Sequence, residues 1–330
     1  MNIPLFEKLH KEGLVNDVSL EKIKSDPSNH LFSVHWEIKT LLYLGVLLLT
    51  GGLGILVYKN INTIGHQAIL AFIIAVSFGS FAYCVINKLP FSTDKVASPN
   101  SFFDYILLLA CLTFIIFIAY IQYQYNIFGD RYGLATFFPM IVLFFAAYYF
   151  DHLGILSLAI TNLGAWLGLT VTPLKILESN DFNSLRIIGT GLFLGLFLIV
   201  LEWGSIKKNI KKHFAPTYAN FGMHLLFISC LAGMFQSDHK YIYWLFLLAG
   251  ITYYFYRRAM QQNSFYFIVV TTLYAYIGIS FVVCQLLFAT SSLSGGDGMG
   301  AIYLGFFYFI ISGIAMLSFL MKINKKIKTI

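Results

Sequence analysis

Ten long apolar stretches, joined by short polar connections, are the feature that most constrains how this chain can fold. About 20 apolar residues in a helix cross the hydrocarbon core of a bilayer, because each residue advances the helix by about 1.5 Å. The stretches lack the alternation of barrel strands, and a helix satisfies its own backbone groups in lipid. The sequence therefore predicts an all-α, polytopic integral membrane protein with about ten transmembrane helices. The predicted spans are residues 40–58, 67–86, 102–123, 133–150, 152–171, 185–203, 217–236, 241–256, 264–289 and 300–321.

Lysine and arginine are divided unequally between alternate connections. If both termini and every second connection face the cytoplasm, that side carries 17 of the 22 basic residues and the other side carries five. Short loops rich in Lys and Arg resist translocation, so the pattern predicts that both termini are cytoplasmic. The net charge of +7 then reflects topology and attraction to membrane lipids, and no nucleic-acid partner is expected. The five basic residues on the opposite side are Lys59, Arg131, Lys175, Arg186 and Lys240.

The longest polar segment predicted to lie outside the membrane is at the N-terminus. Residues 1–38 are predicted to form a cytoplasmic helical segment without a cleavable signal, residues 39–321 the transmembrane domain, and residues 322–330 a basic cytoplasmic tail. The longest connections, such as 172–184, are too short for a folded catalytic domain. Any binding or chemistry must therefore be built from the helices or from their ends.

A Gly-Leu-Val turn lies between two predicted short helices (Lys11 to Val15), and a glycine-rich first span (Gly51 to Gly54) and Asn60 follow it. In these motifs the first 75 residues or so resemble a bacterial family of predicted membrane proteins known only as a domain of unknown function. Family members often have tryptophan after this asparagine, whereas this chain has Ile61, so a role for that tryptophan does not carry over. The resemblance implies a multi-pass protein of the bacterial inner membrane and implies no particular activity.

Charged residues avoid the centres of the predicted spans, which argues against a carboxylate-driven ion pump. Asp104 and Glu202 lie near span ends, and Asp151 and His152 form the very short connection between the fourth and fifth spans. These four residues are candidates for a cytoplasmic mouth, where they could act as acids and bases. The alternative is structural: Asp151 caps the fifth helix, and Glu202 pairs at the interface with Lys207 or Lys208.

Several polar residues lie deeper in the spans. Asn220 and His224 are one helical turn apart, so both must face other helices or a cavity. Interhelical hydrogen bonding, ligand binding and metal ligation all fit His224, although no second ligand lies at metal-binding spacing. For Asn162 and Gln285 the alternatives are interhelical hydrogen bonding and ligand binding. No cofactor motif is present, and no cofactor is expected. Two deep tyrosines, Tyr274 and Tyr276, are predicted to face a polar interior or groove, because their hydroxyls need partners in lipid.

Glycines are concentrated in the first and sixth spans. Ten helices could divide into two inverted halves of five, which would make these two spans equivalent. Paired interrupted helices bind ligands in inverted-repeat transporters, so Gly51, Gly52, Gly189 and Gly191 are candidate ligand-binding positions. The alternative is close helix packing, since Gly191 and Gly195 form a small-xxx-small motif.

Two functions follow as expectations. The first is a transporter or permease-like protein that handles a small apolar or lipidic molecule without carboxylate-based ion coupling. The second is a non-catalytic scaffold or accessory subunit that binds other membrane proteins. The small-molecule substrate is not identified by the sequence, and an enzyme is not expected, although the four mouth residues would suit one if they converged.

Overall fold

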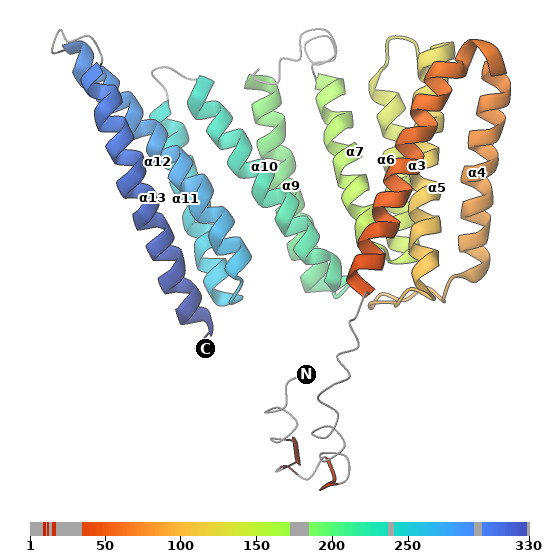
Figure 1. Ribbon diagram of the computed structural model, residues 1–330, viewed down its shortest axis with the longest axis horizontal. Coiled ribbons are helices and arrows are strands. Elements are labelled where there is room, and N and C mark those ends of the chain that lie inside the picture. The colour runs from red at the N-terminus through yellow and green to blue at the C-terminus, as the bar shows by residue number, and fades with distance from the viewer. Residues whose placement is uncertain are drawn as a thin grey trace. The chain divides into compact units, whose positions relative to one another are not determined.

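All regular secondary structure in the described part of the chain is helical, and this part contains no strand. The computed structural model describes residues 35–171, 185–236, 241–293 and 299–328, together with positions 9, 10, 12 and 15–17. Each of the ten predicted spans corresponds to one helix, and only residues 152 and 264 of the spans lie outside these helices (Figure 1), which confirms the predicted fold class. The helices are α3 (His35–Ile64), α4 (His66–Asn87), α5 (Ser101–Tyr125), α6 (Gly133–Phe150), α7 (Leu153–Val171), α9 (Leu185–Lys208), α10 (Ala215–Gln236), α11 (Tyr241–Gln261), α12 (Phe265–Leu293) and α13 (Met299–Lys328), with a 3-10 turn η1 (Lys212–Phe214) before α10.

Eight of these helices are long and apolar enough to cross a membrane. The two others are α7, whose apolar segment is Leu153–Gly168, and α11. In α11 the apolar character is diluted by a tyrosine-rich segment followed by Arg257 and Arg258. Polar residues at the end of a helix lower its hydropathy without preventing it from reaching across the bilayer.

Several helices extend beyond the predicted spans, most of all α3 and α13. α3 begins at His35, five residues before the predicted start, and α13 continues to Lys328. The basic residues predicted to form a tail after residue 321 therefore prolong α13. Hydropathy marks only the part of a helix that lies in lipid, whereas the helix itself continues until its backbone is interrupted. Most of the predicted N-terminal helical segment lies outside the described residues.

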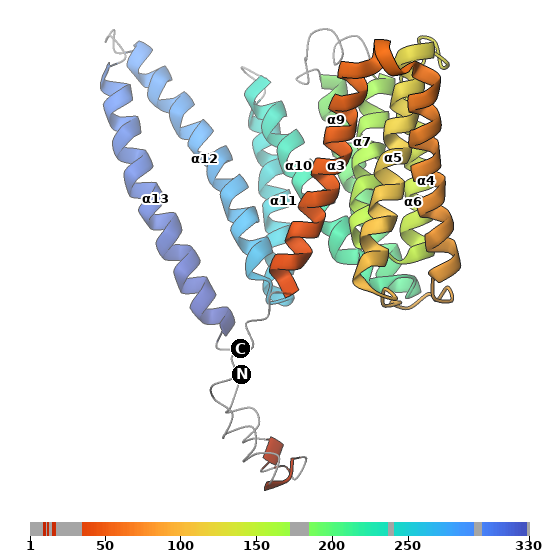
Figure 2. The ribbon, with the colours of Figure 1, turned by 45° about the vertical axis from the view of Figure 1, so that its right-hand side comes forward.

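The chain divides into two units, residues 1–52 and 53–330. Within the second unit, helices that follow one another in sequence pack together: α4 with α5, α6 with α7, α9 with α10, and α11 with both α10 and α12. Figure 2 shows α4 to α7 side by side, and α13 beside α12. The first core of this unit joins α4 to α7 with α9 and α10 around residues such as Leu107, Leu156 and Leu198. A second core joins α10, α11 and α12 around Phe227 and Leu248.

Glycines bring α9 and α10 into close contact. A Cβ atom placed on Gly195 would lie 2.8 Å from Cγ of Leu226 and 3.1 Å from the carbonyl oxygen of Gly222, and one placed on Gly191 would overlap Ser229. The prediction of close packing is therefore confirmed for these two glycines. A Cβ on Gly189 would meet nothing within 4 Å.

The predicted interruption of the first and sixth spans is wrong. α3 and α9 are continuous helices that include Gly51, Gly52, Gly189 and Gly191. A glycine in a helix does not break it when neighbouring residues favour the helical conformation, because its cost is only about 1 kcal/mol relative to alanine. Gly191 and Gly195 of α9 instead allow close contact with α10, whereas Gly189 contacts no other helix in the described part of the chain.

Candidate functional site

Three connections of the second unit meet at one end of its helices. They are the α6–α7 turn, the segment 88–100 between α4 and α5, and the α9–α10 connection. Asp151 ends α6 in the left-handed conformation, with φ 60° and ψ 46°, and its backbone N–H donates to the carbonyl of Ala147. This conformation reverses the chain within two residues. It also leaves the Asp151 carboxylate free to bind the other two connections.

The Asp151 carboxylate accepts hydrogen bonds from three donors. The Lys211 ammonium lies 3.1 Å from Oδ2, His213 Nε2 contacts Oδ1, and the backbone N–H of Val96 donates to Oδ2. The Asp151 and Lys211 side chains are only 2% and 1% exposed. A buried ion pair is tolerated when its remaining hydrogen-bonding groups are satisfied, and this pair meets that condition.

Lys211 also fixes the segment between α4 and α5. Its backbone N–H donates to the carbonyl of Thr93 at 2.8 Å, and its ammonium donates to the carbonyl of Asp94 at 3.3 Å. Ser205 of α9 donates to the carbonyls of Ile210 and Lys211. The connection is therefore held through both its side chains and its backbone.

His152 and Asp104 form a second polar pair beside the first. His152 Nδ1 accepts the backbone N–H of Ile155 at 3.2 Å, and Nε2 lies 3.9 Å from Oδ1 of Asp104. Asp104 also accepts a hydrogen bond from the hydroxyl of Ser98. The predicted N-cap of the fifth span was Asp151, which is wrong: His152 caps α7, because the Asp151 side chain points to Lys211 instead. We call Asp104, Asp151, His152, Lys211 and His213 the Asp151 cluster.

Glu202 does not join this cluster. Its side chain, 3% exposed, binds both terminal nitrogens of Arg258 on α11, with an Nη1–Oε2 distance of 2.7 Å. The predicted pairing with Lys207 or Lys208 is wrong. Those residues follow Glu202 by five and six positions and lie on other sides of α9, where Lys207 is positioned over the ring of Trp203. Three of the four predicted mouth residues are thus brought together, and the fourth is part of a separate ion pair.

Asn220 and His224 take part in a polar network between α10 and α12. Tyr266 donates to Oδ1 of Asn220 at 2.8 Å, and its hydroxyl oxygen lies 3.2 Å from His224 Nε2. His224 Nδ1 lies 2.8 Å from the hydroxyl of Tyr274. The predicted interhelical hydrogen bonding is confirmed, as is the prediction that Tyr274 has a polar partner. The other deep tyrosine, Tyr276, bonds to Ser312 of α13 at 3.0 Å.

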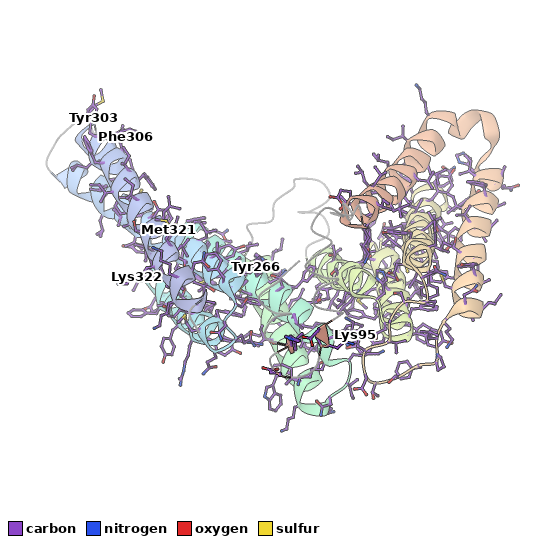
Figure 3. All side chains as sticks on the ribbon, turned by 60° about the horizontal axis from the view of Figure 1, so that its bottom comes forward. Lys95, Tyr266, Tyr303, Phe306, Met321 and Lys322 are labelled. Carbon is purple, nitrogen blue, oxygen red and sulfur yellow. The ribbon has the colours of Figure 1, made fainter. Side chains whose placement is uncertain are left out.

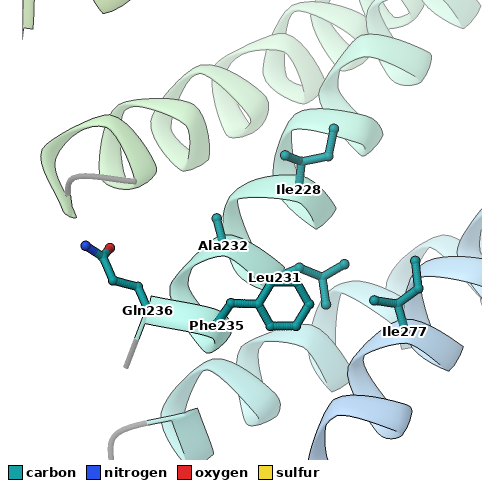
Figure 4. Close-up of a pocket in the computed structure, with 6 residues that line it drawn as sticks. All are labelled: Ile228, Leu231, Ala232, Phe235, Gln236 and Ile277. Carbon is teal, nitrogen blue, oxygen red and sulfur yellow. The ribbon is translucent and has the colours of Figure 1, made fainter. Parts of the chain in front are cut away.

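An apolar pocket of about 390 Å³ lies on the same side of α10 as this polar network. Ile228 follows His224 by one turn, and Ala232 and Phe235 follow Ile228 by one and two turns. Figure 4 shows these side chains with Ile277 of α12 facing them. The pocket is lined by Ile228, Leu231, Ala232, Phe235, Gln236 and Ile277. We call the polar network and this pocket together the α10–α12 face.

The remaining candidates lie elsewhere. Asn162 of α7 donates to the carbonyl of Leu158 within its own helix at 3.1 Å, and Gln285 is exposed on α12. Neither residue lines the apolar pocket. In the described part of the chain, no group of three or more His, Cys, Asp or Glu residues could hold a metal ion. Ligand binding by Asn162 or Gln285 stays a prediction.

Sequence reasoning missed four residues that complete these sites. Lys211 and His213 were among several polar residues of a connection, and Tyr266 was one of 21 tyrosines. Arg258 was counted only as one of the basic residues that indicate the topology. Each contact joins residues more than 40 positions apart, so no local pattern could identify the partner.

These features define a multi-pass membrane protein of the all-helical class. Residues 7–156 match the model of a family described as "Predicted membrane protein (DUF2157)". The match confirms the predicted resemblance and extends it to the start of α7, so it includes Asp104, Asp151 and His152 but not Lys211 or the α10–α12 face. No curated protein and no solved structure matches the chain.

Proposed function

We propose that this protein is a bacterial inner-membrane protein, with both termini in the cytoplasm, that binds and moves a small lipidic molecule without carboxylate-based ion coupling. One observation carries the proposal: on the α10–α12 face a polar network is followed directly by an apolar pocket. An amphipathic molecule fits this order, with its polar group at Asn220 and Tyr266 and its hydrocarbon chain in the pocket. Tyr266 is 51% exposed and therefore accessible to such a group.

The side chains of the α10–α12 face favour a ligand without net charge. The polar groups of the network are an amide, an imidazole and two phenols, and the pocket is lined mainly by aliphatic and aromatic side chains. A free ion would lose its hydration without finding an opposite charge there, whereas an apolar chain would gain contacts. Movement of a lipidic molecule is the function that this arrangement favours.

The experiment measures binding of a fluorescent glucolipid, whose polar group is uncharged, to the purified protein in detergent. Ala232→Phe fills the pocket, and we expect it to weaken binding several-fold. Ala165→Phe is the matched control, since Ala165 is exposed on α7 and outside the pocket. Unchanged binding by Ala232→Phe would contradict the proposal. Transfer of the same probe between the leaflets of proteoliposomes then tests movement: transfer that Ala232→Phe does not slow would contradict transport along this face.

A second proposal, a scaffold or accessory subunit, is favoured by α13. This helix hydrogen-bonds to α12 through Ser312 and Tyr308, while Tyr303, Phe306 and Ile311 are 63%, 63% and 67% exposed. In Figure 3 Tyr303 and Phe306 lie near one end of α13, and Lys322 lies near the other. Aromatic and aliphatic side chains along a helix suit contact with lipid or with a partner helix. Purification in mild detergent as a monomer without co-purifying membrane proteins would contradict this second proposal.

A further inference from the structure

A second pocket, of about 380 Å³, lies where α9, α10, α11 and α12 meet. It is at the same end of the helices as the Asp151 cluster, because Lys212 directly follows Lys211. Its lining combines charged and polar side chains (Glu202, Lys212, Arg258, Gln262, Ser264) with apolar ones (Ile206, Ala215, Pro216, Ala219, Phe267). We call it the Arg258 pocket.

The net charge of this pocket is positive. Glu202 and Arg258 neutralise one another through two hydrogen bonds. Lys212 is exposed and has no ion-pair partner among the described residues, so its charge is available to a ligand. The pocket therefore favours an anion over a cation.

Donors in the pocket suit phosphate oxygens. Arg258 uses three of its five N–H groups, two for Glu202 and one for Tyr254 at 3.4 Å, which leaves two for a ligand. Ser264 and Gln262, whose side chains carry a hydroxyl and an amide, also line the pocket. Guanidinium, ammonium, hydroxyl and amide groups together are the usual donors to a phosphate group.

Apolar residues lie beside these donors. Ile206 and Phe267 are on helices long and apolar enough to cross a membrane, so the wall of the pocket continues toward lipid. Basic pockets between transmembrane helices bind the headgroups of anionic lipids on the cytoplasmic side. We propose that the Arg258 pocket holds the phosphate group of an anionic phospholipid, with its glycerol and upper acyl chain against Ile206 and Phe267.

This site is independent of the lipid-transport proposal. Ala219, which lines the Arg258 pocket, precedes Ala232 by 13 residues, or about 20 Å along α10. Ala232→Phe should therefore leave binding in the Arg258 pocket unchanged, whatever it does to the fluorescent probe. The two proposals can fail separately.

The experiment is native mass spectrometry of the full-length, delipidated protein titrated with phosphatidylglycerol or phosphatidylcholine. Lys212→Gln removes the available cation, and Lys208→Gln removes an exposed cation outside the pocket. We expect Lys212→Gln to weaken phosphatidylglycerol binding about fivefold, as one surface cation does, and Lys208→Gln to leave it nearly unchanged. Both variants should fold, because each residue is exposed. Arg258 is not used for the test, since its loss would leave Glu202 buried without a partner.

Three results would overturn the inference. Equal losses in Lys212→Gln and Lys208→Gln would mean that binding is a general effect of surface charge. Equal binding of phosphatidylcholine and phosphatidylglycerol would mean that the site does not select an anionic lipid. Inorganic phosphate is expected not to displace phosphatidylglycerol at equal concentration, and displacement would make free phosphate the ligand.

Discussion

Replacing Lys211 by methionine should destabilise the protein strongly, because the buried Asp151 carboxylate then loses its ammonium partner. Removing one partner of a buried ion pair costs about 3–5 kcal/mol. Asp151 would keep two of its three donors, the Val96 N–H and His213 Nε2, so the lower end of this range applies. Methionine keeps the length and the unbranched shape of lysine, which limits the change in packing. The expected loss in free energy of unfolding is therefore about 3 kcal/mol.

The assay is unfolding in mixed micelles with increasing sodium dodecyl sulfate, followed by circular dichroism. Lys208→Met is the matched control, because Lys208 is exposed, and it should change the free energy of unfolding by less than about 0.5 kcal/mol. The double variant Asp151→Asn, Lys211→Met removes both charges and should be more stable than Lys211→Met alone. If Lys211→Met unfolds like Lys208→Met, or if the double variant is the least stable of the three, Asp151 and Lys211 do not stabilise one another.

Three further predictions test the packing, the second ion pair and the topology. Gly195→Ala should cost about 1–3 kcal/mol in free energy of unfolding, because its Cβ would meet Leu226 at 2.8 Å, whereas Gly189→Ala has open space and should be neutral or slightly stabilising. The same unfolding assay measures both, and equal effects would contradict close contact of α9 with α10. Arg258→Met should cost about 3 kcal/mol or more by leaving a buried carboxylate unpaired, and a stable variant would show that this ion pair contributes little. A tag inserted in residues 172–184 should react with reagents confined to the periplasm while a C-terminal tag does not, and the opposite pattern would invert the topology.

The helices were predictable from sequence because long apolar runs have few alternatives in lipid. All ten were placed correctly, including the tight reversal at Asp151. The errors lie at the ends: α3 and α13 continue into polar sequence, as at Lys328, where hydropathy gives no signal. The glycines of α9 were predicted to break the helix or to pack it, and only the position of α10 distinguishes these alternatives.

The sites were predictable only in part. Charge near a span end identified Asp104, Asp151, His152 and Glu202, since such groups are costly near lipid and usually have a partner. The partners themselves could not be identified. Lys211 lies in a polar connection, where lysines are usually solvated, and only the packing of three connections makes it 1% exposed. The pairing of Glu202 with Arg258 likewise requires knowledge of how α9 and α11 are placed.

The separation of charged from neutral polar groups has a consequence for the proposed movement of a lipidic molecule. The ion pairs of Asp151 and Glu202 lie at one end of the helices: Asp151 joins the α6–α7 turn to the α4–α5 and α9–α10 connections, and Glu202 joins α9 to α11. The α10–α12 face is held by neutral hydrogen bonds of His224 and Tyr266, each worth about 1 kcal/mol. Breaking a neutral hydrogen bond that a ligand can replace costs far less than separating a buried ion pair. If the protein changes conformation to admit a lipidic molecule, we therefore expect α12 to move relative to α10, while the charged end with the Asp151 cluster stays in place.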